Sequence, residues 1–172
     1  EFISEVIKNR AKSSLNSPHF PSKYKDGALP YQEEAYRAWI ENGKMGIFAM
    51  ATGTGKTVTS LNCAMHEFEK DGYYNLLIIV PTLDLVEQWK EELAAFNYKK
   101  VLNVSSLNLT WRKELLDIVQ KVKRGKDVNS AIVSTYDSFV NKDFQTLLPS
   151  ISTSMILIAD EAHNIGGKNV RA

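Results

Sequence analysis

The stretch GIFAMATGTGKTVTSLNCAM, residues 46–65, decides the fold. Its first five residues form a short apolar run, and the next seven, 51–57, are rich in glycine and threonine. Apolar side chains then recur every three or four positions, as on one face of a helix. These are Val58, Leu61, Met65 and Phe68. The stretch therefore predicts a buried strand at 46–50, a tight turn and a helix, which is the context that a phosphate-binding loop requires.

The turn has the residue types that hold the phosphates of a nucleotide. Glycines let main-chain N–H groups curl around the β-phosphate, and the start of the helix adds positive potential. Lys56 is expected to reach the β- and γ-phosphates, and the Thr57 hydroxyl to bind Mg²⁺. The general pattern GxxxxGK[ST] begins with glycine, whereas Met50 stands at that position here. The other residues expected in the loop are Thr52, Gly53, Thr54 and Gly55.

The alternation of apolar runs and helical patterns continues along the chain. Further strands are predicted at 76–80, 101–104, 131–133 and 155–159, and further helices at 31–42, 83–96 and 111–123. Asp137 is expected to cap one more helix, through Val140, Phe144 and Leu147. Continuous apolar strands separated by helices predict a parallel sheet covered on both faces. The fold class is therefore α/β, a doubly wound, three-layer αβα domain.

Composition excludes several classes of protein. The chain has 172 residues with a net charge of +1, which provides no global attraction to a polyanion, so any such partner must bind at a local patch. A single cysteine, Cys63, excludes an internal disulfide and fits a reducing cytoplasm. No apolar run approaches the roughly 20 residues that span a bilayer, so no membrane association is expected. Residues 1–28 are expected to form a helix and an irregular connector, and 29–172 the main domain.

A second motif, MILIADEAH at 155–163, supplies carboxylates. Asp160 follows an apolar strand, where it is suited to hold Mg²⁺ through water. Glu161 is suited to orient and polarise the water that attacks the γ-phosphorus, because hydrolysis needs an in-line nucleophile and little covalent help from the protein. The carboxyl ends of parallel strands are also where ligands bind in such sheets. The two motifs together predict a Mg²⁺-dependent ATPase centred on Lys56, Asp160 and Glu161.

The two motifs resemble motifs I and II of superfamily 2 helicases and translocases, the DEAH-box group. Three further segments agree: LPYQ at 29–32 resembles the element whose glutamine reads adenine, VPTLDLVEQW at 80–89 resembles motif Ia, and VSTYDSF at 133–139 resembles the motif Ib region. The resemblance covers residues 29–164. It implies a RecA-like P-loop NTPase domain, the first of two such domains, with the second supplying an arginine finger and motif III lying downstream.

Motif I favours one branch of this superfamily. DEAH-type RNA helicases usually have GETGSGKTTQ, whereas this chain has MATGTGKTV at 50–58 and so looks closer to the restriction-enzyme and DNA-repair branch. The resemblance implies an ATP-dependent DNA helicase, with DNA preferred over RNA. Two alternatives stay open. One is a double-stranded DNA translocase subunit of a restriction or phage-defence system, and the other is a nucleotide-gated nucleic-acid-binding module without unwinding.

The resemblance also implies roles for flanking residues. The Gln32 amide is expected to bind the adenine edge with Tyr31 packed nearby, and His163 to link the nucleotide site to the partner domain. Thr82 and Thr135 follow strands, so they are either contacts to the nucleic-acid backbone or plain caps of the next helix. The three tryptophans are expected to pack in the core rather than to stack on bases. They are Trp39, Trp89 and Trp111.

Overall fold

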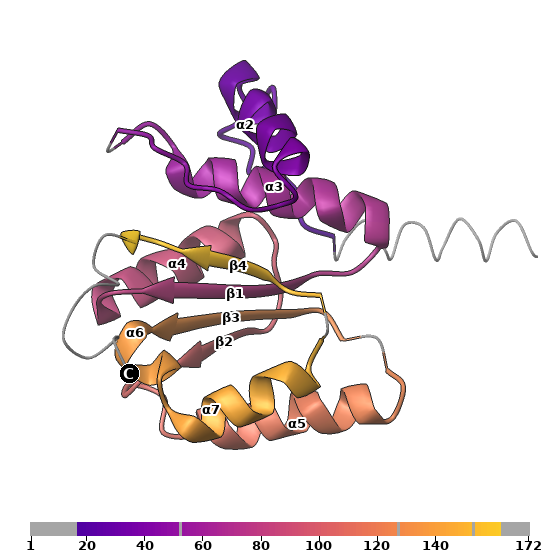
Figure 1. The fold of residues 1–172 in the computed structure, drawn as a ribbon, viewed down its shortest axis with the longest axis vertical. Coiled ribbons are helices and arrows are strands. Elements are labelled where there is room, and N and C mark those ends of the chain that lie inside the picture. Colours follow the sequence, from indigo (N-terminus) through magenta and orange to yellow (C-terminus); the bar gives the residue numbers. More distant parts are fainter. Residues whose placement is uncertain (1–16, 52, 127, 153, 163–172) are drawn as a thin grey trace, which may run out of the picture.

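A four-stranded parallel sheet forms the centre of the molecule (Figure 1). The computed structural model describes residues 17–51, 53–126, 128–152 and 154–162. The strands are β1 (Asn75–Val80), β2 (Val101–Val104), β3 (Ser130–Thr135) and β4 (Ile156–Ala159). They are ordered β2-β3-β1-β4, and each neighbouring pair is parallel. The carboxyl ends of β1 and β4, which precede motifs Ia and II, therefore lie next to each other.

Helices connect the strands, as the apolar patterns predict. They are α2 (Pro30–Glu41), α3 (Lys56–Asp71), α4 (Leu83–Ala95), α5 (Trp111–Lys123), α6 (Tyr136–Phe139) and α7 (Lys142–Leu147), followed by a 3₁₀ turn at Leu148–Ser150. Within the described residues, no helix combines the length and the apolar character needed to cross a lipid bilayer.

Alternate residues of β1 build two separate cores. Leu76, Ile78 and Val80 face a core shared with α3 and α4. Leu77 and Ile79 face the opposite core, which is shared with α5 and α7. Because side chains alternate across a strand, an unbroken apolar run can serve two layers at once. The three-layer αβα arrangement with a doubly wound parallel sheet is confirmed (Figure 1).

The predicted strand at 46–50 is wrong. These residues form neither helix nor strand, and Ile47 is 87% exposed. A strand needs a hydrogen-bonded neighbour, and among the described residues β4 pairs with β1 alone, so the 46–50 run has no strand beside it. The apolar pattern identified a segment suited to a strand, but no strand in the described part of the chain pairs with it.

The predicted helix through Phe144 is also different from the observed one. It is divided into α6 and α7 by Val140 and Asn141. Asp137 caps neither helix, because the side chains of Thr135 and Asn141 accept the first-turn N–H groups instead. The sequence has several possible N-cap residues in close succession. The two that act as caps start two short helices in place of the single predicted one.

The connector before α2 packs on the end of α4. Phe20 and Tyr24 lie 5.3 and 6.0 Å from the ring centre of Phe96, and the His19 N–H donates to the Phe96 carbonyl at 3.0 Å. The helix predicted within 1–15 lies outside the described residues.

Candidate functional site

Motifs I and II line one groove of about 790 Å³, which runs along the edge of the outer strand β4 to its carboxyl end. Its lining includes Lys56 and Thr57 from the start of α3, and Asp160 and Glu161 from the end of β4. Residues separated by more than 100 positions in the sequence thus share one concave surface. The groove therefore brings a cation, a hydroxyl and two carboxylates within one site.

The phosphate loop leaves the start of α3 open to an anion. Gly55 is the residue before α3 and adopts φ = 87°, a left-handed conformation that favours glycine, and no side chain caps the helix there. The first N–H groups of an uncapped helix have no partner within it. The Lys56 ammonium donates only a long 3.3 Å hydrogen bond to the Met50 carbonyl and has no ion pair among the described residues. These donors fit phosphate groups.

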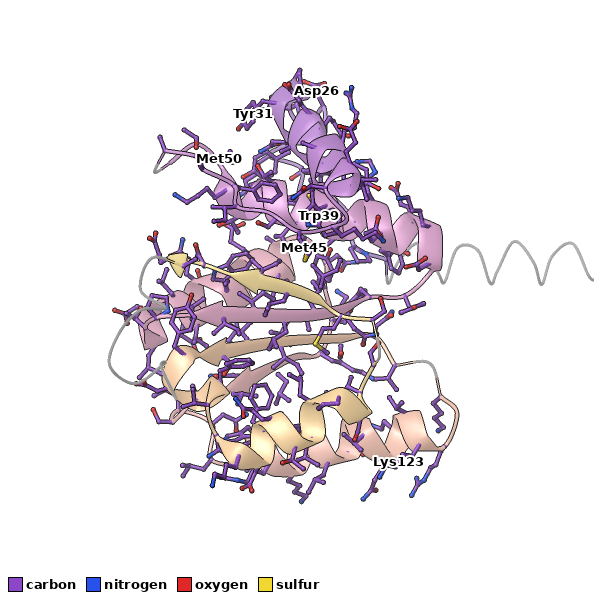
Figure 2. All side chains as sticks on the ribbon, in the orientation of Figure 1. Asp26, Tyr31, Trp39, Met45, Met50 and Lys123 are labelled. Atoms are coloured by element: carbon purple, nitrogen blue, oxygen red, sulfur yellow. The ribbon has the colours of Figure 1, made fainter. Side chains whose placement is uncertain are left out.

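The Tyr31–Gln32 pair packs directly on the phosphate loop. The Tyr31 hydroxyl donates to the Thr54 carbonyl at 2.7 Å (Tyr31 and Met50 are labelled in Figure 2). A Cβ added to Gly55 would lie tightly, at 3.1 Å from Gln32 Nε2 and 3.3 Å from the Tyr31 hydroxyl, at a position whose φ of 87° already favours glycine. α2 therefore holds the loop through both side chains.

Gln32 has a second task, which sequence reasoning missed. It is 3% exposed, and its Oε1 accepts the Leu29 N–H at 2.9 Å, so its side chain caps the start of α2. Its Nε2 donates weakly to the Tyr31 hydroxyl at 3.4 Å. Glutamine three residues after the N-cap is at the position from which a side chain can reach back to the N-cap N–H. The amide oxygen thus has one donor already, and Nε2 has one hydrogen left beyond its contact with Tyr31; the role of Gln32 in adenine recognition stays a prediction.

Asp160 is held by hydrogen bonds from several elements. Its N–H donates to the Ile79 carbonyl at 2.9 Å. Its Oδ1 accepts the Glu161 N–H at 2.9 Å, and its Oδ2 accepts the indole N–H of Trp89 at 2.8 Å. The Tyr136 hydroxyl donates to its main-chain carbonyl at 2.8 Å. Both the backbone and the carboxylate of Asp160 are therefore fixed by the protein itself.

Glu161 adopts an unusual backbone conformation. Its φ is +50°, a left-handed value that is uncommon for residues other than glycine, asparagine and aspartate. Such strain persists where surrounding contacts impose it, and it is often found at functional sites. Burial raises the pKa of the neighbouring Tyr136 phenol, and the charges of Asp160 and Glu161 raise it further. Tyr136 therefore remains a protonated donor beside the two acids.

The groove offers oxygen ligands suited to Mg²⁺. They are the Thr57 hydroxyl and the carboxylates of Asp160 and Glu161. No cluster of three or more His, Cys, Asp or Glu side chains occurs in the described part of the chain. Mg²⁺ is commonly bound by one or two carboxylates together with substrate phosphates, so this donor set fits it.

Thr82 and Thr135 both act as helix N-caps. The Thr82 hydroxyl accepts the Leu85 N–H at 3.3 Å and the residue is exposed, which leaves it accessible. Thr135 is 8% exposed, and its hydroxyl both accepts the Ser138 N–H and donates to Ser138 Oγ. The capping alternative is thus observed for both; contact with nucleic acid stays a prediction. Thr52 and His163 lie outside the described residues.

Sequence reasoning assigned Trp89 and Tyr136 no part in the site. Trp89 is 3% exposed and Trp111 6%, as expected for core residues, whereas Trp39 is only partly buried. Their positions in the sequence could have indicated this role, because Trp89 lies in the segment that resembles motif Ia and Tyr136 in the segment that resembles motif Ib. Both carry a polar group at the end of an apolar ring, and such groups find a partner when buried.

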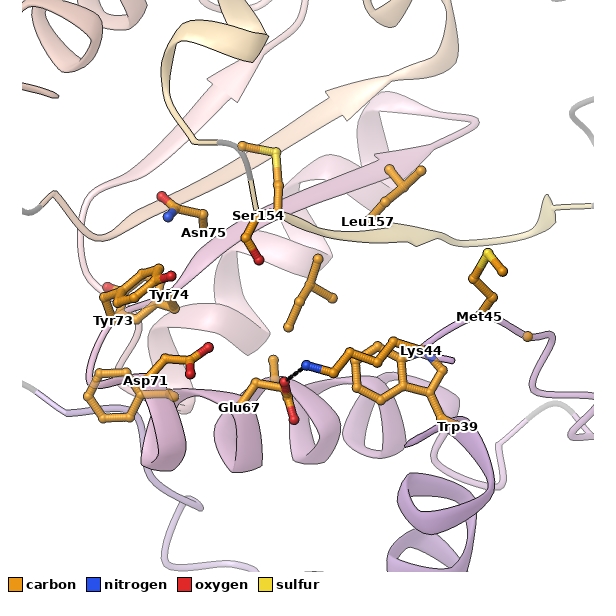
Figure 3. A pocket seen from close by; sticks show the side chains of 15 residues that line it. Trp39, Lys44, Met45, Glu67, Asp71, Tyr73, Tyr74, Asn75, Ser154 and Leu157 are labelled. Carbon is orange, nitrogen blue, oxygen red and sulfur yellow. Dashed lines mark hydrogen bonds and ion pairs between the residues drawn. The ribbon is translucent and has the colours of Figure 1, made fainter. Parts of the chain in front are cut away.

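A second cavity, of about 360 Å³, lies at the opposite end of β4 (Figure 3). It contains none of the predicted site residues. Glu67 lies there, paired with Lys44 from the segment leading to the phosphate loop and with Lys70. Burial alone raises the pKa of the Glu67 carboxyl, but hydrogen bonds from Lys44, Lys70 and Tyr36 outweigh it and hold the pKa below its usual value.

Comparisons with known proteins agree with this arrangement. Residues 26–172 match the family model described as "Type III restriction enzyme, res subunit". The DNA 3'-5' translocase XPB2 of Sulfurisphaera tokodaii is 43% identical over 63 residues, which cover 37% of this chain and 13% of that protein. The structure of a nuclease-deletion mutant of the Type ISP restriction-modification enzyme LlaGI, in complex with a DNA substrate mimic, superposes with a TM-score of 0.61 at 22% identity.

The structural match covers 79% of this chain and 15% of the restriction enzyme, and it shows a shared fold. The matched stretches thus make up only 13% of the translocase and 15% of the restriction enzyme.

Proposed function

The chain belongs to the type III restriction enzyme res-subunit family, and from that premise we propose that it is the first RecA-like motor domain of an ATP-dependent DNA helicase or translocase. The observation that carries the proposal is the groove shared by Lys56, Thr57, Asp160 and Glu161. Phosphoryl transfer depends mainly on positioned charges around the γ-phosphate. A site with one cation, one hydroxyl and two acids, and with an uncapped helix start, is suited to that chemistry.

In this proposal each side of the groove has its own task. The main-chain N–H groups of 52–55 and the Lys56 ammonium bind the β- and γ-phosphates. Thr57 and Asp160 would hold Mg²⁺, which would offset the negative charge of the phosphates. Glu161 orients a water molecule and takes up its proton at a carboxylate oxygen. Gln32 Nε2 donates to adenine, Tyr31 supports the loop, and His163 contacts the partner domain.

DNA is proposed as the polymer. The similar translocase and the similar restriction enzyme are both named for work on DNA, and the segment at 50–58 lacks the features of DEAH-type RNA helicases. Thr82 at the start of α4 and Thr135 at the start of α6 are the proposed backbone contacts. Residues 29–172 form the motor domain after a connector at 1–28, and a second RecA-like domain completes the site with an arginine finger.

Translocation along DNA is favoured over strand separation by one observation: the relative that is 43% identical over 63 residues is named a DNA translocase. Triplex displacement and duplex unwinding assays on the full-length protein separate the two. ATP-dependent displacement of a third strand without separation of the duplex indicates translocation, whereas release of a labelled strand indicates a helicase. An ATPase that neither duplex nor single-stranded DNA stimulates would favour the nucleotide-gated binding module and overturn the motor.

A further inference from the structure

The side chain of Trp89 connects α4 to the carboxylate of Asp160. We propose that Trp89 is a positioning residue that orients this carboxylate for Mg²⁺ and transmits the position of α4 to it. The inference rests on the proposed function, because it takes Asp160 as part of the magnesium site. It assigns a task in the site to a residue for which the apolar pattern predicts only packing.

The contact itself is specific. Trp89 Nε1 lies 2.8 Å from Asp160 Oδ2, and the indole is 3% exposed. An indole nitrogen can only donate, and a donor bound to a carboxylate forms one of the stronger hydrogen bonds in proteins. Since the Glu161 N–H occupies Oδ1, each carboxylate oxygen has one donor. The plane of the carboxylate is thereby fixed, while each oxygen keeps lone-pair capacity for a metal or its water.

Packing alone does not require a tryptophan here. Val86 and Leu93, one turn away on either side along the same stripe of α4, contact the same core with purely apolar side chains. Phenylalanine would supply most of the apolar contact at position 89 but no donor. The ring of Trp89 therefore belongs to the core, and its nitrogen serves the site.

The same side chain links the site to the proposed DNA contact. α4 begins at Leu83, directly after the N-cap Thr82, and Trp89 lies within the same continuous helix. A displacement of the start of α4 would therefore move the indole relative to Asp160. Tyr136 also binds Asp160, but at its main-chain carbonyl, so it holds the backbone; among side chains, Trp89 is the one that contacts the carboxylate in the described residues.

The test replaces the donor and keeps the ring. In the full-length protein, Trp89→Phe and replacement of Trp89 by 3-benzothienylalanine, which exchanges the N–H for sulfur with nearly the same shape, are compared with Trp111→Phe. Trp111 is similarly buried at 6%, but it packs against Phe144 in the other core. The readout is Mn²⁺ affinity in the presence of a non-hydrolysable ATP analogue, measured by electron paramagnetic resonance.

Loss of a residue that orients a metal ligand typically costs ten- to a hundredfold in metal affinity. We expect Mn²⁺ affinity to fall about tenfold in both Trp89 variants and to stay unchanged in Trp111→Phe. If Trp89→Phe does not fold, the benzothienyl variant decides alone, since its shape is retained. Wild-type affinity in that variant would overturn the inference. Failure of the wild-type protein to bind Mn²⁺ with the analogue would instead overturn the proposed function.

A second readout tests transmission through α4. Coupling between two binding sites is reciprocal, so if this contact carries it, weakening the contact must reduce the effect of nucleotide on DNA affinity. We expect the Trp89 variants to bind duplex DNA normally without nucleotide, but to show a severalfold smaller change in DNA affinity when the ATP analogue and Mg²⁺ are added. An unchanged response alongside weakened Mn²⁺ binding would overturn the transmitting role.

Discussion

The two sides of the groove are built in different ways. On the motif II side, Asp160 ends a hydrogen-bonded strand and receives donors from α4 and α6. On the motif I side, the segment at 46–50 is in no sheet, and α3 contacts it through two long hydrogen bonds to Met50, from Lys56 at 3.3 Å and from Thr59 at 3.7 Å. The acid is therefore oriented by the fold itself, whereas the loop is shaped by two glycines with positive φ and by the Tyr31–Gln32 pair.

The two sides therefore differ in how far they are arranged for catalysis before a nucleotide binds. A fixed carboxylate needs no reorganisation when charge develops near it, which is the main advantage of a preorganised site. A loop with uncapped N–H groups gains its partners only when an anion arrives. We therefore expect changes on the motif II side to affect turnover, and changes on the motif I side to affect nucleotide affinity.

The largest effect is expected on the motif II side. Glu161→Gln keeps the shape of the side chain but removes the base, and general-base catalysis contributes typically 10²–10⁴ in rate. We expect the DNA-stimulated ATPase rate of the full-length protein to fall by about that factor, with nucleotide affinity retained. Glu87→Gln, an exposed substitution on α4, serves as the control. A wild-type rate in Glu161→Gln would assign the base to another residue.

Two isoleucines test whether the sheet or the 46–50 segment supports the fold. Ile78 is fully buried in β1, whereas Ile47 is 87% exposed. Ile78→Ala should lower the free energy of unfolding by about 2–5 kcal/mol, and Ile47→Ala should change it by less than about 0.5 kcal/mol. Urea denaturation of the 172-residue chain measures both. Equal losses would mean that the 46–50 segment is packed in solution.

On the motif I side the expected change is in affinity. Lys56→Ala removes the one cation of the loop, and hydrogen bonds to charged groups contribute about 1.5–3 kcal/mol. We expect nucleotide affinity to fall roughly ten- to a hundredfold, measured by titration with a fluorescent ATP analogue. Lys113→Ala, on the exposed face of α5, is the matched control. Should both variants bind equally well, Lys56 would not contact the phosphates.

The sequence predicts the sheet and its helices better than it predicts the segment on the motif I side. The residues that build the sheet and its helices were predictable because their apolar patterns are continuous: Val101–Val104 and Trp111–Lys123 have the expected bounds. The structure of the segment at 46–50 was not predictable, because a strand needs a neighbouring strand that the residues of the segment do not specify. Motifs reveal which side chains gather in the groove. They do not reveal that Trp89 holds Asp160, because that contact joins residues 71 positions apart.

The smallest effect concerns the ion pair that ties the motif I side to α3. Lys44, in the segment leading to the loop, pairs with Glu67, whereas the side-chain groups that hold Asp160 are the neutral donors Trp89 and Tyr136. Because the folded-state pKa of Glu67 lies below its unfolded value near 4.5, this pair stabilises the protein above that pH. The contribution is lost as the pH falls through the lower, folded-state pKa.

Glu67→Gln should therefore lower the free energy of unfolding near pH 7 by no more than about 1 kcal/mol, because both lysines are about half exposed and solvent screens the pairs. The difference from wild type should shrink as the pH is lowered below about 4.5, where protonated Glu67 resembles glutamine. Urea denaturation of both proteins between pH 7 and 3.5 measures it. A difference that stays constant over this range would mean that Glu67 acts through packing, and the motif I side would then have no charge-dependent anchor.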